Sequence, residues 1–128
     1  MAFYTNKTKD DLKKELQRSC IHDGIVNSFL FDLQSGSVVI LLTNTFFQKK
    51  MKMIFGGVKA IEYNTEQCDN DCEEFYRSAL IIVTVEEDNN DGIDREVKNE
   101  ANIHVCYQFL SMAELHICAE TVTIDPSF

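Results

Sequence analysis

The sequence is poor in the residues that interrupt, cross-link or tether a chain. Its 128 residues include no tryptophan, one proline and five glycines. So few turn and linker residues exclude a flexible tether between domains, and the chain shows no internal repeat or low-complexity tract. A chain of this length buries roughly two-thirds of the surface that it exposes when unfolded. We therefore expect a single domain over residues 1–128.

Long hydrophobic runs are also missing. The longest strictly aliphatic run covers residues 38–42, far short of the roughly 20 residues that cross a bilayer. The first ten residues contain no apolar stretch of the kind found in a signal peptide. Five cysteines, an odd number, indicate reduced thiols and not a disulfide framework. We expect a cytoplasmic protein that does not associate with membranes.

Charge is present in quantity but is divided unevenly along the chain. Residues 1–60 carry nine Lys or Arg against five Asp or Glu, a net charge of +4, whereas residues 61–128 carry three against sixteen, a net charge of −13. A concentrated negative field attracts basic partners and repels nucleic acid. We predict that carboxylates of two connecting segments form a partner-binding surface: Glu66, Asp69, Asp71, Glu73, Glu74, Glu86, Glu87, Asp88, Asp91, Asp94 and Glu96.

The acidic segment at residues 87–98 has some of the spacing of a calcium-binding EF-hand loop. Aligned on Gly92, however, Lys98 stands where a bidentate carboxylate is required, and no flanking helices are evident. A hairpin turn at Asn90-Asp91-Gly92 is the simpler interpretation.

The apolar periodicity predicts one helix followed by strands. Thr8 with Asp10 and Asp11 is typical of a helix N-terminus, so we expect a helix over residues 8–19 that lies on a sheet as a lid. From residue 24 the period changes to two, which predicts a hairpin over residues 24–33 and 37–47. The second strand of this hairpin is apolar on both faces at residues 38–42, which is typical of a central strand covered on both sides.

Later segments extend the sheet. We expect strands at residues 50–55 and 58–63, divided by a bulge at Gly56-Gly57, with lysines that would suit an edge. Three more strands are expected at residues 78–85, 101–110 and 113–124. The predicted fold class is α+β, with the N-terminal helix packed on a mainly antiparallel, curved β-sheet or partly closed barrel of six to eight strands.

The last two strands place histidines and cysteines together. If the apolar sets of both strands face one core, Tyr107 lies opposite residue 115 or 117. The four side chains His104, Cys106, His116 and Cys118 then share the other face, where the same spacing suits a Cys/His zinc site. The alternative is a half-buried polar face packed under the helix. A nucleophilic Cys–His pair is disfavoured because no glycine-rich or helix-N-terminal turn presents the thiol.

Three segments carry a resemblance to known proteins: Cys20-Ile21-His22-Asp23-Gly24-Ile25, Phe29-Leu30-Phe31-Asp32 and Ile54-Phe55-Gly56-Gly57-Val58-Lys59-Ala60-Ile61. They resemble a loose group of small uncharacterised bacterial proteins in which a His-Asp-Gly/Ser-x-Ile entry precedes a hairpin and a Phe-x-Gly-Val segment follows. Residues 115–124 resemble the closing strand of that group. Some members are similar to immunity proteins encoded beside polymorphic toxins, and the resemblance implies no catalytic residues.

Two functional hypotheses follow. The first is a non-enzymatic protein-interaction module, of the immunity-inhibitor type, that docks a basic protein such as a toxin through the acidic C-terminal half and needs no cofactor. The alternative is a small metal-binding or ligand-binding domain that uses the Cys/His face.

Overall fold

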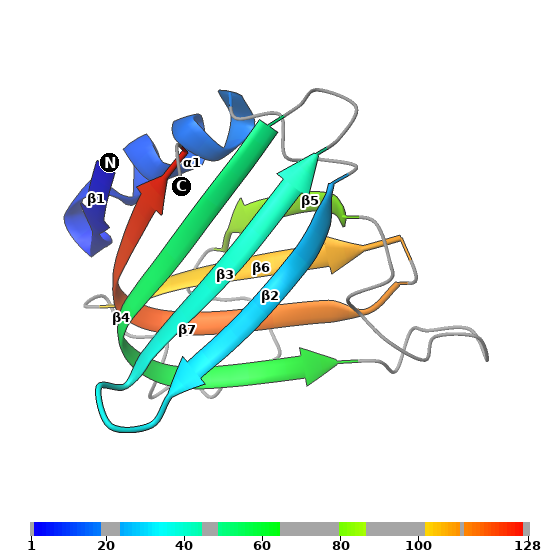
Figure 1. Ribbon diagram of the computed structural model, residues 1–128. Coiled ribbons are helices and arrows are strands. Elements are labelled where there is room, and N and C mark those ends of the chain that lie inside the picture. Colours follow the sequence, from blue (N-terminus) through cyan, green and yellow to red (C-terminus); the bar gives the residue numbers. More distant parts are fainter. Residues whose placement is uncertain are drawn as a thin grey trace.

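The computed structural model describes residues 2–18, 24–44, 49–64, 80–86, 102–110 and 112–126. One N-terminal helix, α1 (Lys9–Arg18), packs on a curved antiparallel sheet of seven strands (Figure 1). This confirms the α+β prediction. The strands are β1 (Ala2–Thr5), β2 (Ile25–Asp32), β3 (Ser37–Asn44), β4 (Lys49–Asn64), β5 (Leu80–Val85), β6 (Ile103–Phe109) and β7 (Glu114–Asp125).

The strand order is β2-β3-β4-β7-β6-β5, and β1 pairs with the C-terminal part of β7. The outermost strands of this path approach each other at one end, where the Leu80 amide donates to the Gly24 carbonyl at 2.8 Å. No strand pairing joins β2 to β5 within the described segments. The sheet is therefore curved and open.

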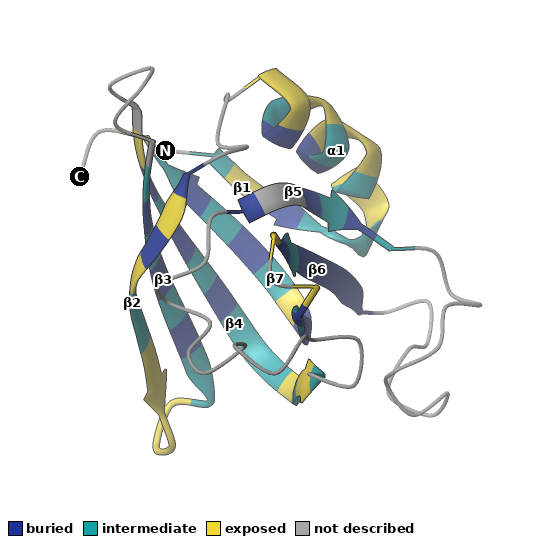
Figure 2. Ribbon diagram, turned by 90° about the vertical axis from the view of Figure 1, so that its right-hand side faces the viewer, coloured by how far each residue is buried: buried dark blue, intermediate teal, exposed yellow. Residues whose placement is uncertain are grey.

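The sheet folds over at a corner in β4 and β7. The register between these strands shifts between Val58 and Ala60, where β4 has one residue more than β7. Close to this point, Gly57 adopts a left-handed conformation with φ of 61°. An extra residue of this kind bends a strand and increases its twist. Beyond the corner, β2, β3 and the first part of β4 lie across from β5, β6 and the first part of β7 (Figures 1 and 2).

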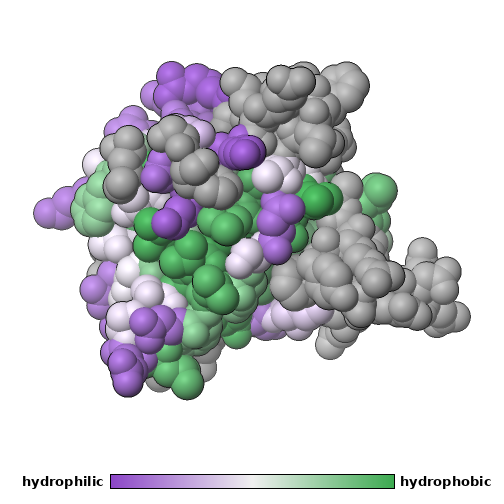
Figure 3. Space-filling model, in the orientation of Figure 1, coloured by the Kyte–Doolittle hydropathy of each residue, from purple (hydrophilic) through white to green (hydrophobic). Residues whose placement is uncertain are grey.

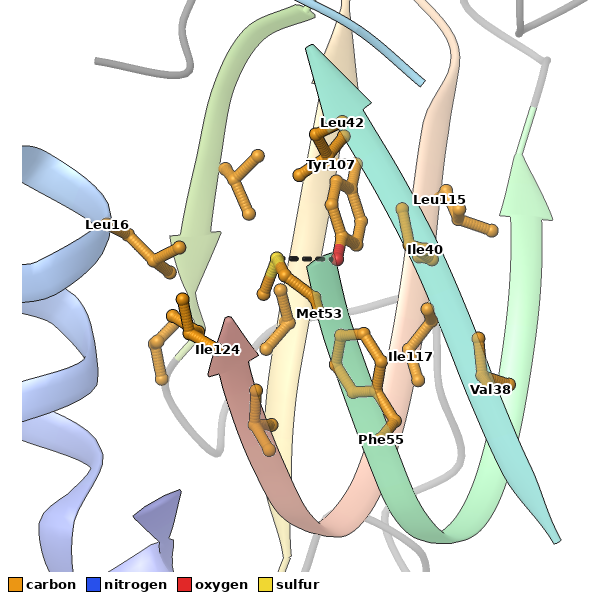
Figure 4. Close-up of a cluster of buried hydrophobic side chains, with 14 of the residues drawn as sticks. Leu16, Val38, Ile40, Leu42, Met53, Phe55, Tyr107, Leu115, Ile117 and Ile124 are labelled. Carbon is orange, nitrogen blue, oxygen red and sulfur yellow. Dashed lines mark hydrogen bonds between the residues drawn. The ribbon is translucent and has the colours of Figure 1, made fainter. Parts of the chain in front are cut away.

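The apolar core fills the space between these two layers (Figure 4). Tyr107 is fully buried at its centre, where its hydroxyl donates to Met53 Sδ at 3.1 Å and its ring meets Phe55 edge-on. The other large and fully buried side chains are Phe109, Leu12, Ile40, Leu42, Met51, Leu80, Ile103, Ile117 and Ile124.

The N-terminal segment differs from the prediction in two respects. Residues 2–5 form β1, a strand that the sequence did not predict because four residues offer no clear alternation. A 3-10 turn (Asn6–Thr8) precedes α1, and Thr5 and Thr8 cap it reciprocally, so the helical segment begins before Thr8. The helix buries Leu12 and Leu16 in the core (Figure 4). It therefore does not cover the Cys/His face, and the prediction that this face packs under the helix is wrong.

Two predictions about individual strands also need correction. β4 is not edge-like, because it pairs with β3 on one side and β7 on the other, and the edge of this layer is β2. In β3, Val38, Ile40 and Leu42 are buried, but Val39 and Leu41 are only half-buried on the opposite face. The expectation that β3 is covered on both sides therefore holds on the core face and only in part on the outer face.

Candidate functional site

The register of β6 and β7 brings the predicted Cys/His residues together. Tyr107 pairs with Leu115, one of the two expected partners, so His104 pairs with Cys118 and Cys106 pairs with His116. All four side chains point away from the core-facing set, and each of the four residues as a whole is at most 5% exposed. Cys106 and Cys118 are buried thiols.

His116 is the centre of this polar cluster. Its Nδ1 lies 2.7 Å from Nε2 of His104, a distance that requires one nitrogen to donate and the other to accept. Its Nε2 faces Sγ of Cys106 at 3.7 Å and Oε1 of Glu114 at 3.5 Å. The two sides of one imidazole thus contact different partners.

Two carboxylates belong to this cluster that the Cys/His prediction did not include. Glu114 precedes His116 by two residues on β7, so alternation places both on one face, and its side chain is 33% exposed. Glu86 follows β5, accepts a hydrogen bond from Thr84 Oγ1 at 3.2 Å and also hydrogen bonds the Cys106 thiol. We predicted Glu86 for the acidic partner-binding surface, whereas its carboxylate is half-buried beside Cys106.

The electrostatics of Cys106 are those of a protonated thiol. Burial, first of all, and then the negative charges of Glu114 and Glu86 raise its pKa well above the usual range. A nucleophilic cysteine needs the opposite environment, with nearby positive charge and some exposure. In addition, the thiol and the Glu114 carboxylate both face Nε2 of His116, whereas in a catalytic triad they would face opposite ring nitrogens.

The cluster has the donor set of a metal site. The Cys106 sulfur, one carboxylate oxygen of Glu114 and one ring nitrogen of His116 all lie within 4.8 Å of one another. This is the one such group of three within the segments that the structure describes. Of the four predicted metal ligands, Cys106 and His116 therefore belong to the group. His104 contacts the opposite ring nitrogen of His116. Cys118 is not part of the group, whose third member is Glu114.

The predicted acidic surface falls almost wholly outside the described residues. This applies to Glu66, Asp69, Asp71, Glu73, Glu74, Glu87, Asp88, Asp91, Asp94 and Glu96, and also to Cys20, His22 and the turn at residues 90–92. Glu86 alone among the predicted partner-binding residues is described.

A second feature lies on the outer face of β2, β3 and β4. Leu30 pairs with Val39 and Val39 with Ile54, so these three side chains form one row across the strands. Leu41 projects from β3 on the same face, two residues from Val39. We call Leu30, Val39, Leu41 and Ile54 the outer patch. Leu30 is 63% exposed and the other three are half-buried, and an apolar area is visible over these strands in Figure 3.

The outer patch borders the edge of the sheet. Within the described segments, β2 pairs with β3 and with no strand on its other side. Exposed edges are usually protected by lysine, proline or other charges. β2 contains neither lysine nor proline, and its one charged residue is Asp32 at its end. Among the segments that the structure describes, no strand therefore pairs with this edge.

Comparisons with known proteins identify the fold but no family. No family model matches the chain, and no curated protein matches it significantly. It is similar in structure to an uncharacterised protein from Neisseria gonorrhoeae, with a TM-score of 0.58 and 10% sequence identity over 82% of this chain and 92% of that one. Within the described segments, no helix is long and apolar enough to span a membrane.

Proposed function

We propose that this chain is a non-enzymatic protein-interaction module, of the immunity-inhibitor type, that docks a basic partner on the outer patch. The observation that carries the proposal is the row of apolar side chains, Leu30, Val39 and Ile54, on the solvent side of the sheet. A contiguous apolar patch on an otherwise polar surface is typical of a protein contact.

The open edge of β2 suggests how the partner binds. An added strand would hydrogen bond to the backbone of β2, while its side chains on the outer face would cover Leu30. This mode uses the main chain for affinity and the outer patch for selectivity. It also explains why β2 lacks the charged residues that usually protect an edge.

The charge of the chain selects the class of partner. The net charge is −9, and residues 61–128 alone carry −13. A field of this sign accelerates the encounter with a basic protein and repels an acidic one. The outer patch itself consists of four uncharged side chains, and beside it Lys52 and Asp125 are partners in the register of β4 and β7. We assign affinity to the apolar contact and the rate of association to the acidic half.

Two further observations support a non-enzymatic, immunity-type role. The environment of Cys106 disfavours a thiolate, which argues against nucleophilic catalysis at the most obvious cluster of reactive groups. The segments around Phe29 and Ile54 resemble a loose group of small bacterial proteins, some of which are similar to immunity proteins, and these segments also carry the outer patch.

A capture experiment with a matched pair of variants tests the proposal. Tagged wild-type protein, Leu30→Glu and Leu110→Glu are each used as bait in a native lysate at low salt. Leu110 is a suitable control because it is 68% exposed but lies next to β6, outside the outer patch. Burying the exposed part of Leu30 contributes about 1–2 kcal/mol, so Leu30→Glu should weaken capture about 5- to 30-fold.

The expected result is a basic protein retained by wild type and Leu110→Glu, lost with Leu30→Glu, and retained less as salt increases. Equal capture by Leu30→Glu and wild type would refute docking on the outer patch. Capture of acidic proteins, or of nothing except a second copy of this chain, would contradict the assigned class of partner.

A further inference from the structure

We propose that Cys106, Glu114 and His116 form a zinc site. This inference is independent of the proposed docking function, because the three ligands lie on the opposite layer of the sheet from the outer patch. Sulfur, imidazole nitrogen and carboxylate oxygen together make a donor set that suits Zn²⁺ and not the oxygen-selective cations Ca²⁺ and Mg²⁺.

Two of the three distances between the donor atoms are close to the edges of a tetrahedral site. Zinc binds sulfur at about 2.3 Å and nitrogen or oxygen at about 2.0–2.1 Å, so the tetrahedral edges are about 3.5 Å for S···N and about 3.4 Å for N···O. The corresponding distances here are 3.7 Å from Cys106 to His116 and 3.5 Å from His116 to Glu114. Shifts of a few tenths of an ångström would therefore complete both of these edges, and the third pair, the Cys106 sulfur and the Glu114 carboxylate oxygen, lies within 4.8 Å.

His104 is the positioning residue for this site. Metal-bound histidines usually donate their second ring N–H to a neighbouring acceptor, which fixes the ring and its tautomer. Nε2 of His104 lies 2.7 Å from Nδ1 of His116, so it can accept that proton. The lone pair of Nε2 of His116 then points at Cys106 and Glu114, where the ion would bind.

The charges balance when zinc binds. The S–H bond of Cys106 breaks, its proton passes to solvent, and an S–Zn bond forms. The thiolate and the Glu114 carboxylate together neutralise the 2+ charge, and the imidazole remains neutral. Glu62 pairs with His116 from β4 and Glu86 approaches the thiol from β5, so two more carboxylates attract a cation to this face.

Access to the site is through Glu114. The other two ligands are buried, with Cys106 fully enclosed and the His116 side chain 6% exposed, but the Glu114 side chain is 33% exposed. The ion can therefore enter from the Glu114 side, and a water molecule from the same side takes the fourth position.

Zinc titration of the purified, chelator-treated protein tests the site. Wild type should bind about one equivalent against a competing chromophoric chelator. Cys106→Ser and Glu114→Gln should each bind at least about tenfold more weakly. Cys118→Ser is the matched control, because Cys118 is an equally buried thiol on the same face but is not one of the three ligands, so its affinity should stay at the wild-type value.

Two further measurements keep the test decisive if a buried variant folds poorly. Circular dichroism establishes which variants are folded, and Glu114→Gln is conservative because the side chain is partly exposed. Cobalt bound to wild type should show a thiolate-to-metal charge-transfer band that persists in Cys118→Ser. The proposal is overturned if wild type binds less than about a tenth of an equivalent, if Cys118→Ser loses as much affinity as Cys106→Ser, or if the cobalt complex lacks the thiolate band.

Discussion

Replacing Gly57 with alanine tests the corner that folds the sheet into two layers. Gly57 has φ of 61°, and a Cβ there would lie 2.7 Å from Cδ of Glu120. The left-handed conformation costs a non-glycine residue about 1–2 kcal/mol, whereas alanine recovers about 0.4–1 kcal/mol by restricting the unfolded chain. Displacing Glu120 also breaks its exposed ion pair with Lys59 at 2.9 Å, which contributes at most about 1 kcal/mol. We expect Gly57→Ala to lower the free energy of unfolding by about 1–2 kcal/mol.

The matched control is Gly36→Ala in the turn between β2 and β3. Gly36 has nearly the same φ, 65°, but nothing lies within 4 Å of its added Cβ. Gly36→Ala should therefore lower the free energy of unfolding only through the strain of the backbone, by about 1 kcal/mol or less. Urea unfolding followed by circular dichroism measures both variants. In a Glu120→Ala background, the cost of Gly57→Ala should fall to that of Gly36→Ala. If Gly57→Ala leaves the stability unchanged, or if Glu120→Ala does not relieve its cost, the account of the corner is wrong.

Three other predictions follow from the core and the polar cluster. Leu12→Ala should lower the free energy of unfolding by about 2–5 kcal/mol in urea melts, because it leaves a cavity beneath α1. Burial raises the pKa values of Cys106 and Tyr107, so the folded state retains protons that the unfolded chain loses. Stability should therefore be constant up to about pH 8. It should then fall by about 1.4 kcal/mol per pH unit for each group, above about pH 9 for Cys106 and above about pH 10 for Tyr107, measured by alkaline titration of the urea midpoint. Native Cys106 should react with thiol reagents only as fast as the protein opens, as peptide mapping of the modified thiols can show.

Local patterns in the sequence predicted much of the fold. Thr8, Asp10 and Asp11 indicated the helix to within two residues of its observed start, and the alternation around Tyr107 restricted the register of β6 and β7 to alternatives that include the observed one. These features depend on residues that are close together in the sequence and on apolar residues that recur with a period of two in strands or 3.6 in helices. A single sequence shows both. β1 escaped prediction because its stability comes from pairing with β7, more than a hundred residues away.

The candidate sites were harder to predict for a physical reason. Val39 and Leu41 make the outer face of β3 apolar, which is typical of a strand covered on both sides. The sequence shows that both faces are apolar, but it does not show whether a second layer packs on each of them. Glu86 was assigned to the solvent because charges are usually exposed, and its approach to Cys106 depends on where β5 lies. Glu114 could have been found, because it shares the alternation of His116 and Cys118 on one strand.

The central claim is that a partner binds the outer patch and the edge of β2, and amide hydrogen exchange tests it most directly. Once a basic partner has been captured, exchange is compared for the chain alone and in the complex. The account predicts slower exchange at residues 28–32 of β2 in the complex, because their outward amides gain partners in an added strand. Unchanged exchange across β2, with new protection confined to other segments, would contradict it.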